Sequence, residues 1–315
     1  MSEKTELLRA GVIGVGRLGR EHARVYAGLE SATLVGVVDV DAARAKEIAD
    51  LHGARVFASV DELLREVDAV SVVVPTDQHF PVAMKALEAG VHTLVEKPIT
   101  PTLSEAEALV DAARHSHVSL QVGHIERYNA AVRSVREVLD GPRFIECHRL
   151  GPFQPRGTEV SVILDLMIHD IDIVLSLVNS TVERVEAVGV SVLSQHEDIA
   201  NARLTFANGA VANITASRVS PERMRKIRIF QSDAYISLDY VEQDYVIYRK
   251  TEAGIESRAV DLPKDEPLAL ELSDFVDCIA RSRKPEVSGE NAMAALEVAL
   301  WVTREVALNR KLWDR

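Results

Sequence analysis

Residues 7–20, "LLRAGVIGVGRLGR", decide the expected fold of the first part of the chain. The run up to Ile13 is mostly apolar without polar alternation, which is typical of a parallel strand buried on both faces. The glycines that follow have the spacing G-x-G-x-x-G, and residues 17–29, "RLGREHARVYAGL", have a helical pattern. A buried strand, a glycine-rich turn and a helix in this order predict the start of a βαβ unit.

The same alternation of strand and helix continues to residue 122. Each later strand-like run is followed by a helical segment, so the pattern predicts a doubly wound parallel sheet in an N-terminal α/β domain, residues 1–122. The later strand-like runs are residues 32–40, 54–59, 68–75, 91–98 and 117–124.

After residue 140 the strand-like segments follow one another with little helix between them. In "FANGAV", residues 206–211, Asn208-Gly209 separates two strand runs, which is a strong signal for a two-residue hairpin. We therefore predict a C-terminal α+β domain, residues 123–315, with an open, mostly antiparallel β-sheet. Two helices are expected near the end of the chain, and they can pack back against the first domain.

Composition limits the classes of partner. The chain has 315 residues, and its 36 lysines and arginines against 48 acidic residues give a formal net charge of −12. This charge argues against nucleic acid or an anionic membrane surface as a partner, although a small anionic ligand remains compatible with it. No segment has the pattern of a membrane span or a signal peptide, and Cys147 and Cys278 form no disulfide framework or metal-ligand spacing. We expect a cytoplasmic protein without a bound metal.

The glycine-rich turn is a candidate phosphate-binding loop with the Rossmann fingerprint. Gly14 allows a tight turn, Gly16 lets the backbone approach a pyrophosphate, and Gly19 permits close helix packing. Arg17 and Leu18 lie between the last two glycines, at the helix N-terminus that favours an anion. The alternative is a glycine turn without a cofactor.

Asp39 ends the second predicted strand, 20 residues beyond Gly19. A carboxylate at this place accepts hydrogen bonds from the ribose hydroxyls of NAD and repels the additional phosphate of NADP. The nearest following arginine is Arg44, which could still move in to accommodate that phosphate. The sequence favours NAD over NADP.

Residues 160–178, "VSVILDLMIHDIDIVLSLV", predict a buried helix interrupted by ionisable side chains. At about 100° per residue, Asp165, His169 and Asp172 fall within roughly 60° of one another, whereas Asp170 lies away from them. Buried carboxylates need partners, so such a stripe lines a cleft or is internally paired. One interpretation is a histidine general base oriented by a carboxylate, and the other is a helix cap with satisfied core polar groups.

Several motifs in this order resemble the Gfo/Idh/MocA family, the group of glucose–fructose oxidoreductase and inositol dehydrogenase. The resemblance covers nearly the whole chain and implies that the second domain has helices on one face of its sheet, while the other face commonly forms the subunit interface. The motifs are "GVGRLG" (14–19), "VPTDQH" (74–79), "EKP" (96–98), "GHIERYN" (123–129) and "DLMIHDID" (165–172).

The resemblance implies roles for the polar residues that end the fifth predicted strand. Lys97 would bond the reacting hydroxyl and a nicotinamide ribose, and it would stabilise alkoxide character. Glu96 would orient the strand end and contact the cofactor, and Pro98 would fix the bend, often through a cis peptide bond in this family. This expectation explains why a buried strand ends on a charged pair and a proline.

The resemblance also implies which residues transfer the proton and which loop covers the cofactor. His169 would take the hydroxyl proton as hydride leaves the same carbon, and Asp165 would position the substrate and His169. Asp172 is a weaker candidate on the same face. The loop that covers the cofactor is matched by Pro75, Thr76 and His79.

The substrate is expected to be a sugar or a nucleotide sugar. Within the family the chain most resembles the branch acting on nucleotide-linked amino sugars, especially UDP-N-acetylglucosamine 3-dehydrogenases, which implies oxidation at C3 of a UDP-N-acetylhexosamine. Arginines near a cleft would suit a diphosphate, although they could equally be structural. The candidate substrate contacts are His124, Arg127, Tyr128, Asn129 and Arg156.

Two other functions stay open. The first is an NAD-dependent dehydrogenase of a free sugar or inositol. The second is a non-catalytic, cofactor-sensing regulatory protein of the same fold, which the intact Lys97, Asp165 and His169 argue against. A homodimer or homotetramer is expected in either case.

Overall fold

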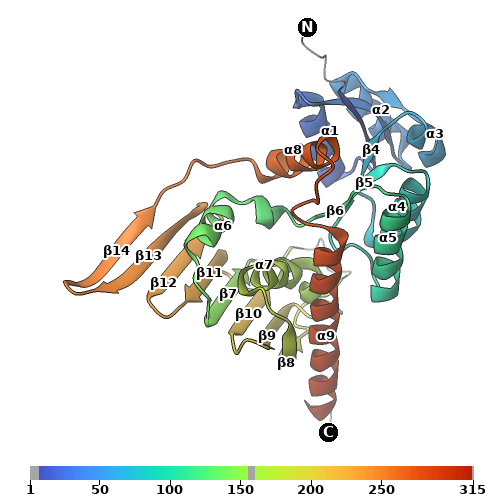
Figure 1. The fold of residues 1–315 in the computed structure, drawn as a ribbon. Helices are drawn as coiled ribbons and strands as arrows, with labels where there is room; N and C mark the ends of the chain where they lie inside the picture. Colours follow the sequence, from blue (N-terminus) through green and yellow to red (C-terminus); the bar gives the residue numbers. More distant parts are fainter. Residues whose placement is uncertain (1–6, 155–159, 314–315) are drawn as a thin grey trace. The chain divides into compact units, whose positions relative to one another are not determined.

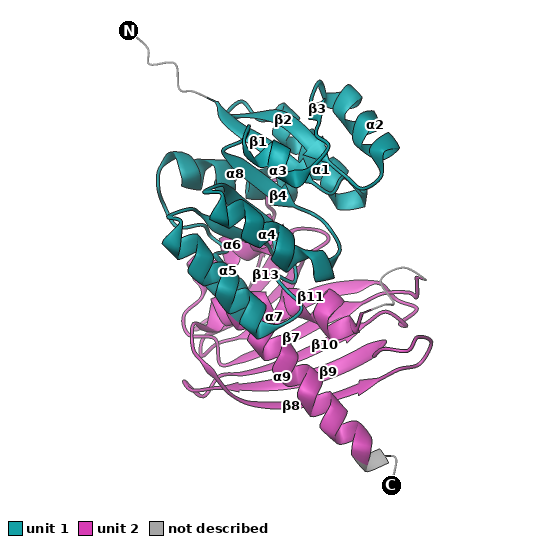
Figure 2. Cartoon of the chain, turned by 90° about the vertical axis from the view of Figure 1, so that its right-hand side faces the viewer, with its two compact units in different colours: residues 1–125, 266–293 teal, residues 126–265, 294–315 magenta. Residues whose placement is uncertain are grey.

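The computed structural model describes residues 7–154 and 160–313, and the chain divides into two compact units. Unit 1 comprises residues 1–125 and 266–293, and unit 2 comprises residues 126–265 and 294–315 (Figure 2). The sequence predicts a boundary at residue 122 and late helices that can pack back against the first domain. In the structure the chain returns to unit 1 after residue 265 and leaves it again within the last helix.

Unit 1 contains a six-stranded parallel sheet in the order β3-β2-β1-β4-β5-β6. Strands β4, β5 and β6 of this sheet are labelled in Figure 1. The predicted doubly wound parallel sheet is therefore confirmed. Strand order reverses between β1 and β4, and ligands bind at the carboxyl ends of the strands at such a point. The strands are β1 (Leu8–Ile13), β2 (Ala32–Val38), β3 (Arg55–Val56), β4 (Ala69–Val72), β5 (His92–Glu96) and β6 (Leu120–Gly123).

One helix of unit 1 comes from far along the chain. Helix α8 places Leu272, Phe275 and Val276 in the same buried cluster as Val12 of β1 and Tyr26 of α1. Its apolar face thus completes a core that the first 125 residues leave open. The helices of unit 1 are α1 (Arg17–Gly28), α2 (Ala42–His52), α3 (Val60–Leu64), α4 (His79–Glu88), α5 (Leu103–His115) and α8 (Pro267–Ala280).

Unit 2 contains an eight-stranded sheet in the order β14-β13-β12-β11-β7-β10-β9-β8. All neighbouring strands are antiparallel except β7 and β10, so the prediction of a mostly antiparallel sheet is confirmed. The predicted hairpin joins β9 to β10, with Gly209 at a φ of +82°. The strands are β7 (Phe144–Leu150), β8 (Val182–Val190), β9 (Ile199–Phe206), β10 (Val211–Ser217), β11 (Met224–Phe230), β12 (Ala234–Asp239), β13 (Asp244–Thr251) and β14 (Gly254–Val260).

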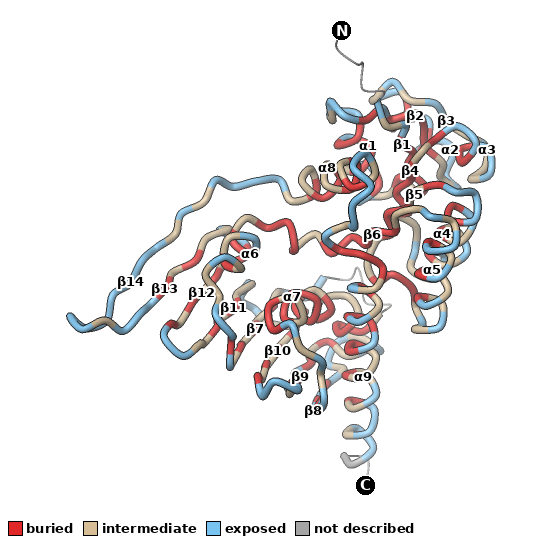
Figure 3. The backbone as a smooth tube through the Cα atoms, viewed as in Figure 1, coloured by how far each residue is buried: buried red, intermediate tan, exposed pale blue. Residues whose placement is uncertain are grey.

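The two faces of this sheet differ. Alternate side chains of its strands pack in one core with α6 (Ala130–Val135), α7 (Ile168–Val178) and the unit 2 part of α9 (Gly289–Trp313). Helix α7 is buried along nearly all of its length, whereas β14 is exposed (Figure 3). The opposite face carries a row of aromatic rings whose neighbouring centroids are 4.8 to 5.6 Å apart: Phe144, Phe230, Tyr235 and Tyr248.

Candidate active site

The glycine-rich turn between β1 and α1 is built from glycines with different spatial demands. Gly14 has a φ of +86°, and a Cβ there would lie 2.5 Å from the carbonyl oxygen of Val73, so a larger residue is excluded. A Cβ on Gly19 would overlap the carbonyl group of Gly14. A Cβ on Gly16, by contrast, would have no atom of the described residues within 4 Å, and none of their side chains caps the helix N-terminus there. Open backbone at a helix N-terminus suits a pyrophosphate.

Asp39 follows β2 directly and is tied to this turn. Its Oδ2 accepts a hydrogen bond from the backbone N–H of Val15 at 2.7 Å, and its side chain is 5% exposed. Arg44 lies 3.7 Å from the same carboxylate, so it is already close to the position where an additional phosphate would need a cation. Arg17 and Leu18 are exposed in the first turn of α1. The turn and the carboxylate together fit a dinucleotide.

The segment after β4 contains the residues predicted to cover the cofactor. Pro75 is exposed, Thr76 begins a short 3₁₀ turn, and His79 begins α4 and is buried. The His79 ring nitrogens lie 2.8 Å from the carbonyl oxygen of Pro98 and 2.9 Å from that of Val74. Burial lowers the pKa of His79, although these two contacts act in the opposite direction. His79 therefore links the β4 loop to the turn after β5, and its cofactor contact stays a prediction.

The end of β5 and the turn after it contain the glutamate, lysine and proline of the EKP motif. Glu96 is the last residue of β5, and the Lys97–Pro98 peptide bond is cis, as the family resemblance implied. The backbone N–H of Lys97 donates to Glu96 Oε2 at 3.2 Å. The two charged residues thus lie at the carboxyl edge of the parallel sheet, where this fold binds ligands.

Asp165 and His169 lie on two different kinds of helix. Asp165 belongs to a π-helical turn, η4 (Ile163–Met167), and His169 belongs to the first turn of α7. The predicted α-helical spacing of 100° per residue therefore does not apply across this segment, because a π turn contains an additional residue. Both side chains are half-buried. Single π turns often occur at functional sites.

The two carboxylates of α7 are bound by arginines. Arg149 donates to both oxygens of Asp170, at 2.8 and 3.0 Å, and its Nη1 donates to Glu126 at 2.8 Å. Arg127 donates to both oxygens of Asp172, at 2.6 and 2.9 Å. Both arginines and both aspartates are buried. Two of the predicted substrate contacts, Arg127 and Asp172, are therefore brought together as a bidentate ion pair, and their substrate contact stays a prediction.

The remaining candidate substrate contacts are mostly buried. His124 lies in unit 1, whereas Tyr128 and Asn129 lie in unit 2, and all three are buried. Asn129 accepts from the backbone N–H of Ala131 at the start of α6 and donates to the carbonyl oxygen of Tyr240. Asn129 therefore has a structural role as a helix cap. Arg156 lies outside the described residues.

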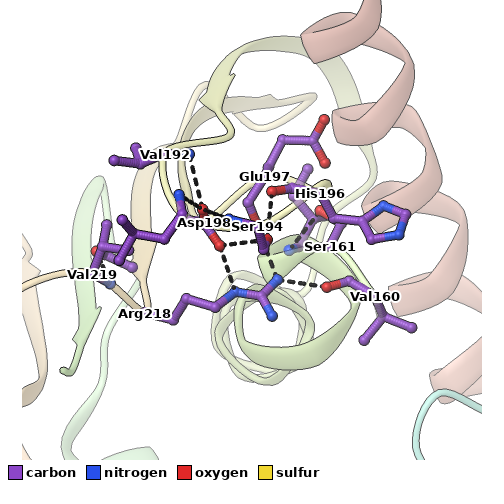
Figure 4. Close-up of polar contacts among 12 residues, drawn as sticks. Val160, Ser161, Val192, Ser194, His196, Glu197, Asp198, Arg218 and Val219 are labelled. Atoms are coloured by element: carbon purple, nitrogen blue, oxygen red, sulfur yellow. Dashed lines mark hydrogen bonds and ion pairs between the residues drawn. The ribbon is translucent and has the colours of Figure 1, made fainter. Parts of the chain in front are cut away.

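A network that the sequence did not indicate anchors the entry to the helix with Asp165 and His169 (Figure 4). Arg218, directly after β10, donates to the carbonyl oxygens of Val160 and Glu197. The backbone N–H of Val162 donates to the same Glu197 carbonyl at 3.0 Å. The chain is thus fixed immediately before the π turn.

Asp198 is the acidic partner in this network. Its side chain is fully buried and lies 3.5 Å from Arg218 Nε. Its Oδ2 accepts from the backbone N–H groups of residues 192–194, and Oδ1 accepts from the Ser194 hydroxyl. Burial acts to raise the pKa of Asp198, but these hydrogen bonds outweigh it and lower the pKa to about 2. The carboxylate remains charged and holds the loop and the arginine together.

The predicted site residues are distributed over both units. The glycine turn, Asp39, Glu96 and Lys97 belong to unit 1, and the segment with Asp165 and His169 belongs to unit 2. Within residues 7–154 and 160–313, no group of three or more histidines, cysteines or carboxylates could hold a metal ion. No helix of the described chain is long and apolar enough to cross a membrane.

Comparisons with known proteins cover both units. A family model described as "Oxidoreductase family, NAD-binding Rossmann fold" matches residues 8–124, and one described as "GFO/IDH/MocA C-terminal domain" matches residues 132–237. The UDP-N-acetylglucosamine 3-dehydrogenase of Acidithiobacillus ferrooxidans is 45% identical over 94% of this chain and 96% of its own. A solved structure of that enzyme has a TM-score of 0.93 at 44% identity and covers 96% of this chain and 98% of that chain. The myo-inositol 2-dehydrogenase of Thermotoga maritima is 28% identical over 92% and 93% of the two chains.

The buried pair of Arg127 and Asp172 can be tested by its effect on stability. Replacing Asp172 with Asn leaves a buried guanidinium without its charged partner, so the free energy of unfolding should fall by about 3–5 kcal/mol. The exposed Lys46–Asp50 pair supplies the control, because Asp50→Asn should cost about 1 kcal/mol or less. Urea unfolding measures both. Unchanged stability for Asp172→Asn would contradict the structural role and favour a substrate contact.

Proposed function

Because the chain belongs to the Gfo/Idh/MocA oxidoreductase family, we propose that it oxidises a sugar hydroxyl to a ketone, at C3 of a UDP-N-acetylhexosamine. The proposed identity of the substrate is supported by the similarity, over nearly the whole chain, to a UDP-N-acetylglucosamine 3-dehydrogenase. The family is NAD-binding, and the open Gly16 backbone and the Asp39 carboxylate fit NAD.

The proposed reaction removes a hydride and a proton from one carbinol group. NAD, when bound, supplies the acceptor for the hydride. His169 accepts the hydroxyl proton on a ring nitrogen, and Asp165 orients the imidazole and the substrate. The Lys97 ammonium donates to the same oxygen, so the negative charge that develops there is stabilised while the C=O bond forms.

A free polyol substrate is the alternative that a specific observation supports. The chain is also similar to inositol dehydrogenases over more than nine-tenths of its length, although at lower identity. Arg127 uses two of its nitrogens on Asp172, so it offers a diphosphate fewer donors than the sequence suggests. Turnover of myo-inositol with an inert nucleotide sugar would select this alternative.

Turnover tests the proposal directly. Purified protein with NAD and UDP-N-acetylglucosamine should form NADH, and the product should carry a ketone at C3. His169→Ala and Lys97→Met should each lower kcat by about 100-fold or more, because each removes a group that acts on the reacting oxygen.

The control is Lys85→Met, which removes an exposed lysine of α4 and should leave kcat unchanged. Binding of NAD without turnover of either substrate would favour the cofactor-sensing alternative. Full activity of His169→Ala would contradict its role as the base.

Asp39 should determine the preference for NAD over NADP. Asp39→Ser removes the charge that repels the additional phosphate, and Arg44 remains beside the vacated position. The ratio of kcat/KM for NADP to that for NAD should rise about tenfold or more, which corresponds to about 1.4 kcal/mol. Asp50→Ser, at an exposed aspartate of α2, is the control. An unchanged ratio would show that Asp39 does not determine the preference for NAD over NADP.

We also propose a homodimer or homotetramer that buries the face of the unit 2 sheet with the aromatic row. The aromatic row on that face supplies large, rigid contact area, which is enriched at subunit interfaces. Tyr235→Asp should therefore convert the oligomer to smaller species in light scattering. Leu51→Asp, at an exposed position of α2, should leave the mass unchanged. A monomeric wild-type protein would contradict this proposal.

A further inference from the structure

His22 is a buried polar residue that no sequence motif indicated. It lies on α1, three residues after the last glycine of the turn, and is 0% exposed. Its Nε2 is 3.2 Å from Glu96 Oε1, so the proton on this nitrogen points at a carboxylate. Its Nδ1 has no hydrogen-bond partner among the described residues. Glu96 is therefore the polar contact that orients the ring.

Strand β6 also lies against the Glu96 carboxylate. Gly123 of β6 pairs with Glu96, and a Cβ on Gly123 would lie 2.8 Å from Glu96 Oε1. The second carboxylate oxygen accepts from the backbone N–H of Lys97. Burial acts to raise the pKa of Glu96, but the contacts with His22 and Lys97 outweigh it and lower the pKa. The carboxylate thus stays ionised between a helix and a turn.

These contacts form a continuous connection from α1 to the lysine. The helix whose N-terminus would face the pyrophosphate also carries His22, and His22 holds the glutamate that bonds the Lys97 backbone. We propose that His22 is a positioning residue that acts through Glu96 to set the geometry of Lys97. The inference rests on the proposed function, because that function makes Lys97 a catalytic residue.

The contacts define what each substitution removes. His22→Ala deletes the donor to Glu96 and leaves space beside a partly buried carboxylate. His22→Gln keeps an N–H donor on a side chain of similar reach, so it is the conservative variant. Tyr26→Phe is the matched control: Tyr26 is also 0% exposed, lies one turn further along α1 and bonds Ser71 rather than the turn after β5.

Kinetics with NAD and UDP-N-acetylglucosamine give the first measurement. His22→Ala should lower kcat about tenfold or more with little change in the KM for NAD, because a misplaced lysine weakens the transition state rather than cofactor binding. His22→Gln should recover most of the loss, and Tyr26→Phe should change kcat by less than about twofold. Equal losses of kcat in His22→Ala and Tyr26→Phe at matched thermal stability would overturn the proposal.

A second measurement does not depend on turnover. The rate at which acetic anhydride modifies Lys97 can be followed by mass spectrometry, with the exposed Lys85 as an internal reference in the same sample. The Lys97 rate relative to Lys85 should change in His22→Ala and Glu96→Gln but not in Tyr26→Phe. An unchanged ratio in all variants would overturn the proposal. Full activity of Lys97→Met would instead refute the proposed function, while the labelling result would still report on His22.

Discussion

The cost of burying a carboxylate is the constraint on which both units depend. An ionised carboxylate removed from water is unfavourable unless cations or several N–H groups face it. Asp172 meets Arg127, Asp198 meets Arg218 and a row of backbone N–H groups, and Glu96 meets His22. In each case a side-chain partner (Arg127, Arg218 or His22) comes from another element of the fold. Satisfying the charge therefore also fixes how that element packs, and neighbouring residues such as Lys97 are positioned as a result.

The features that the sequence predicts well depend on short-range chemistry. Gly14 and Gly209 both adopt a positive φ, which glycine tolerates without strain. Both lie at predicted turns, Gly14 from the spacing of the glycines and Gly209 from the Asn-Gly pair between two strand runs. The alternation of buried strands and helices likewise predicts the parallel sheet, because each segment shows its own period. The succession of strand-like and helical segments along the chain and the family resemblance predict the rest of the two-domain architecture.

The features that the sequence does not predict arise between distant residues or from a local irregularity. Arg127 and Asp172 are 45 residues apart, and nothing in either neighbourhood indicates that they pair. The sequence around His22 indicates only that the residue lies on a helix, because its role depends on a contact with Glu96, 74 residues later. The π turn at Ile163–Met167 changes the direction of Asp165 relative to α7, and a periodicity based on 3.6 residues per turn cannot reveal it.

Helix α8 has a consequence for the order of folding. Unit 1 is interrupted by residues 126–265, and its core lacks Leu272 and Phe275 until the ribosome has made the chain beyond them. Domains usually fold in the order in which they are synthesised. Here the first unit cannot complete its core before residues 126–265 of the second have emerged, and the second unit is completed in turn only by residues 294–315. The nascent chain should expose the apolar face of α1 that α8 later covers, and it should need protection from aggregation until synthesis is nearly complete.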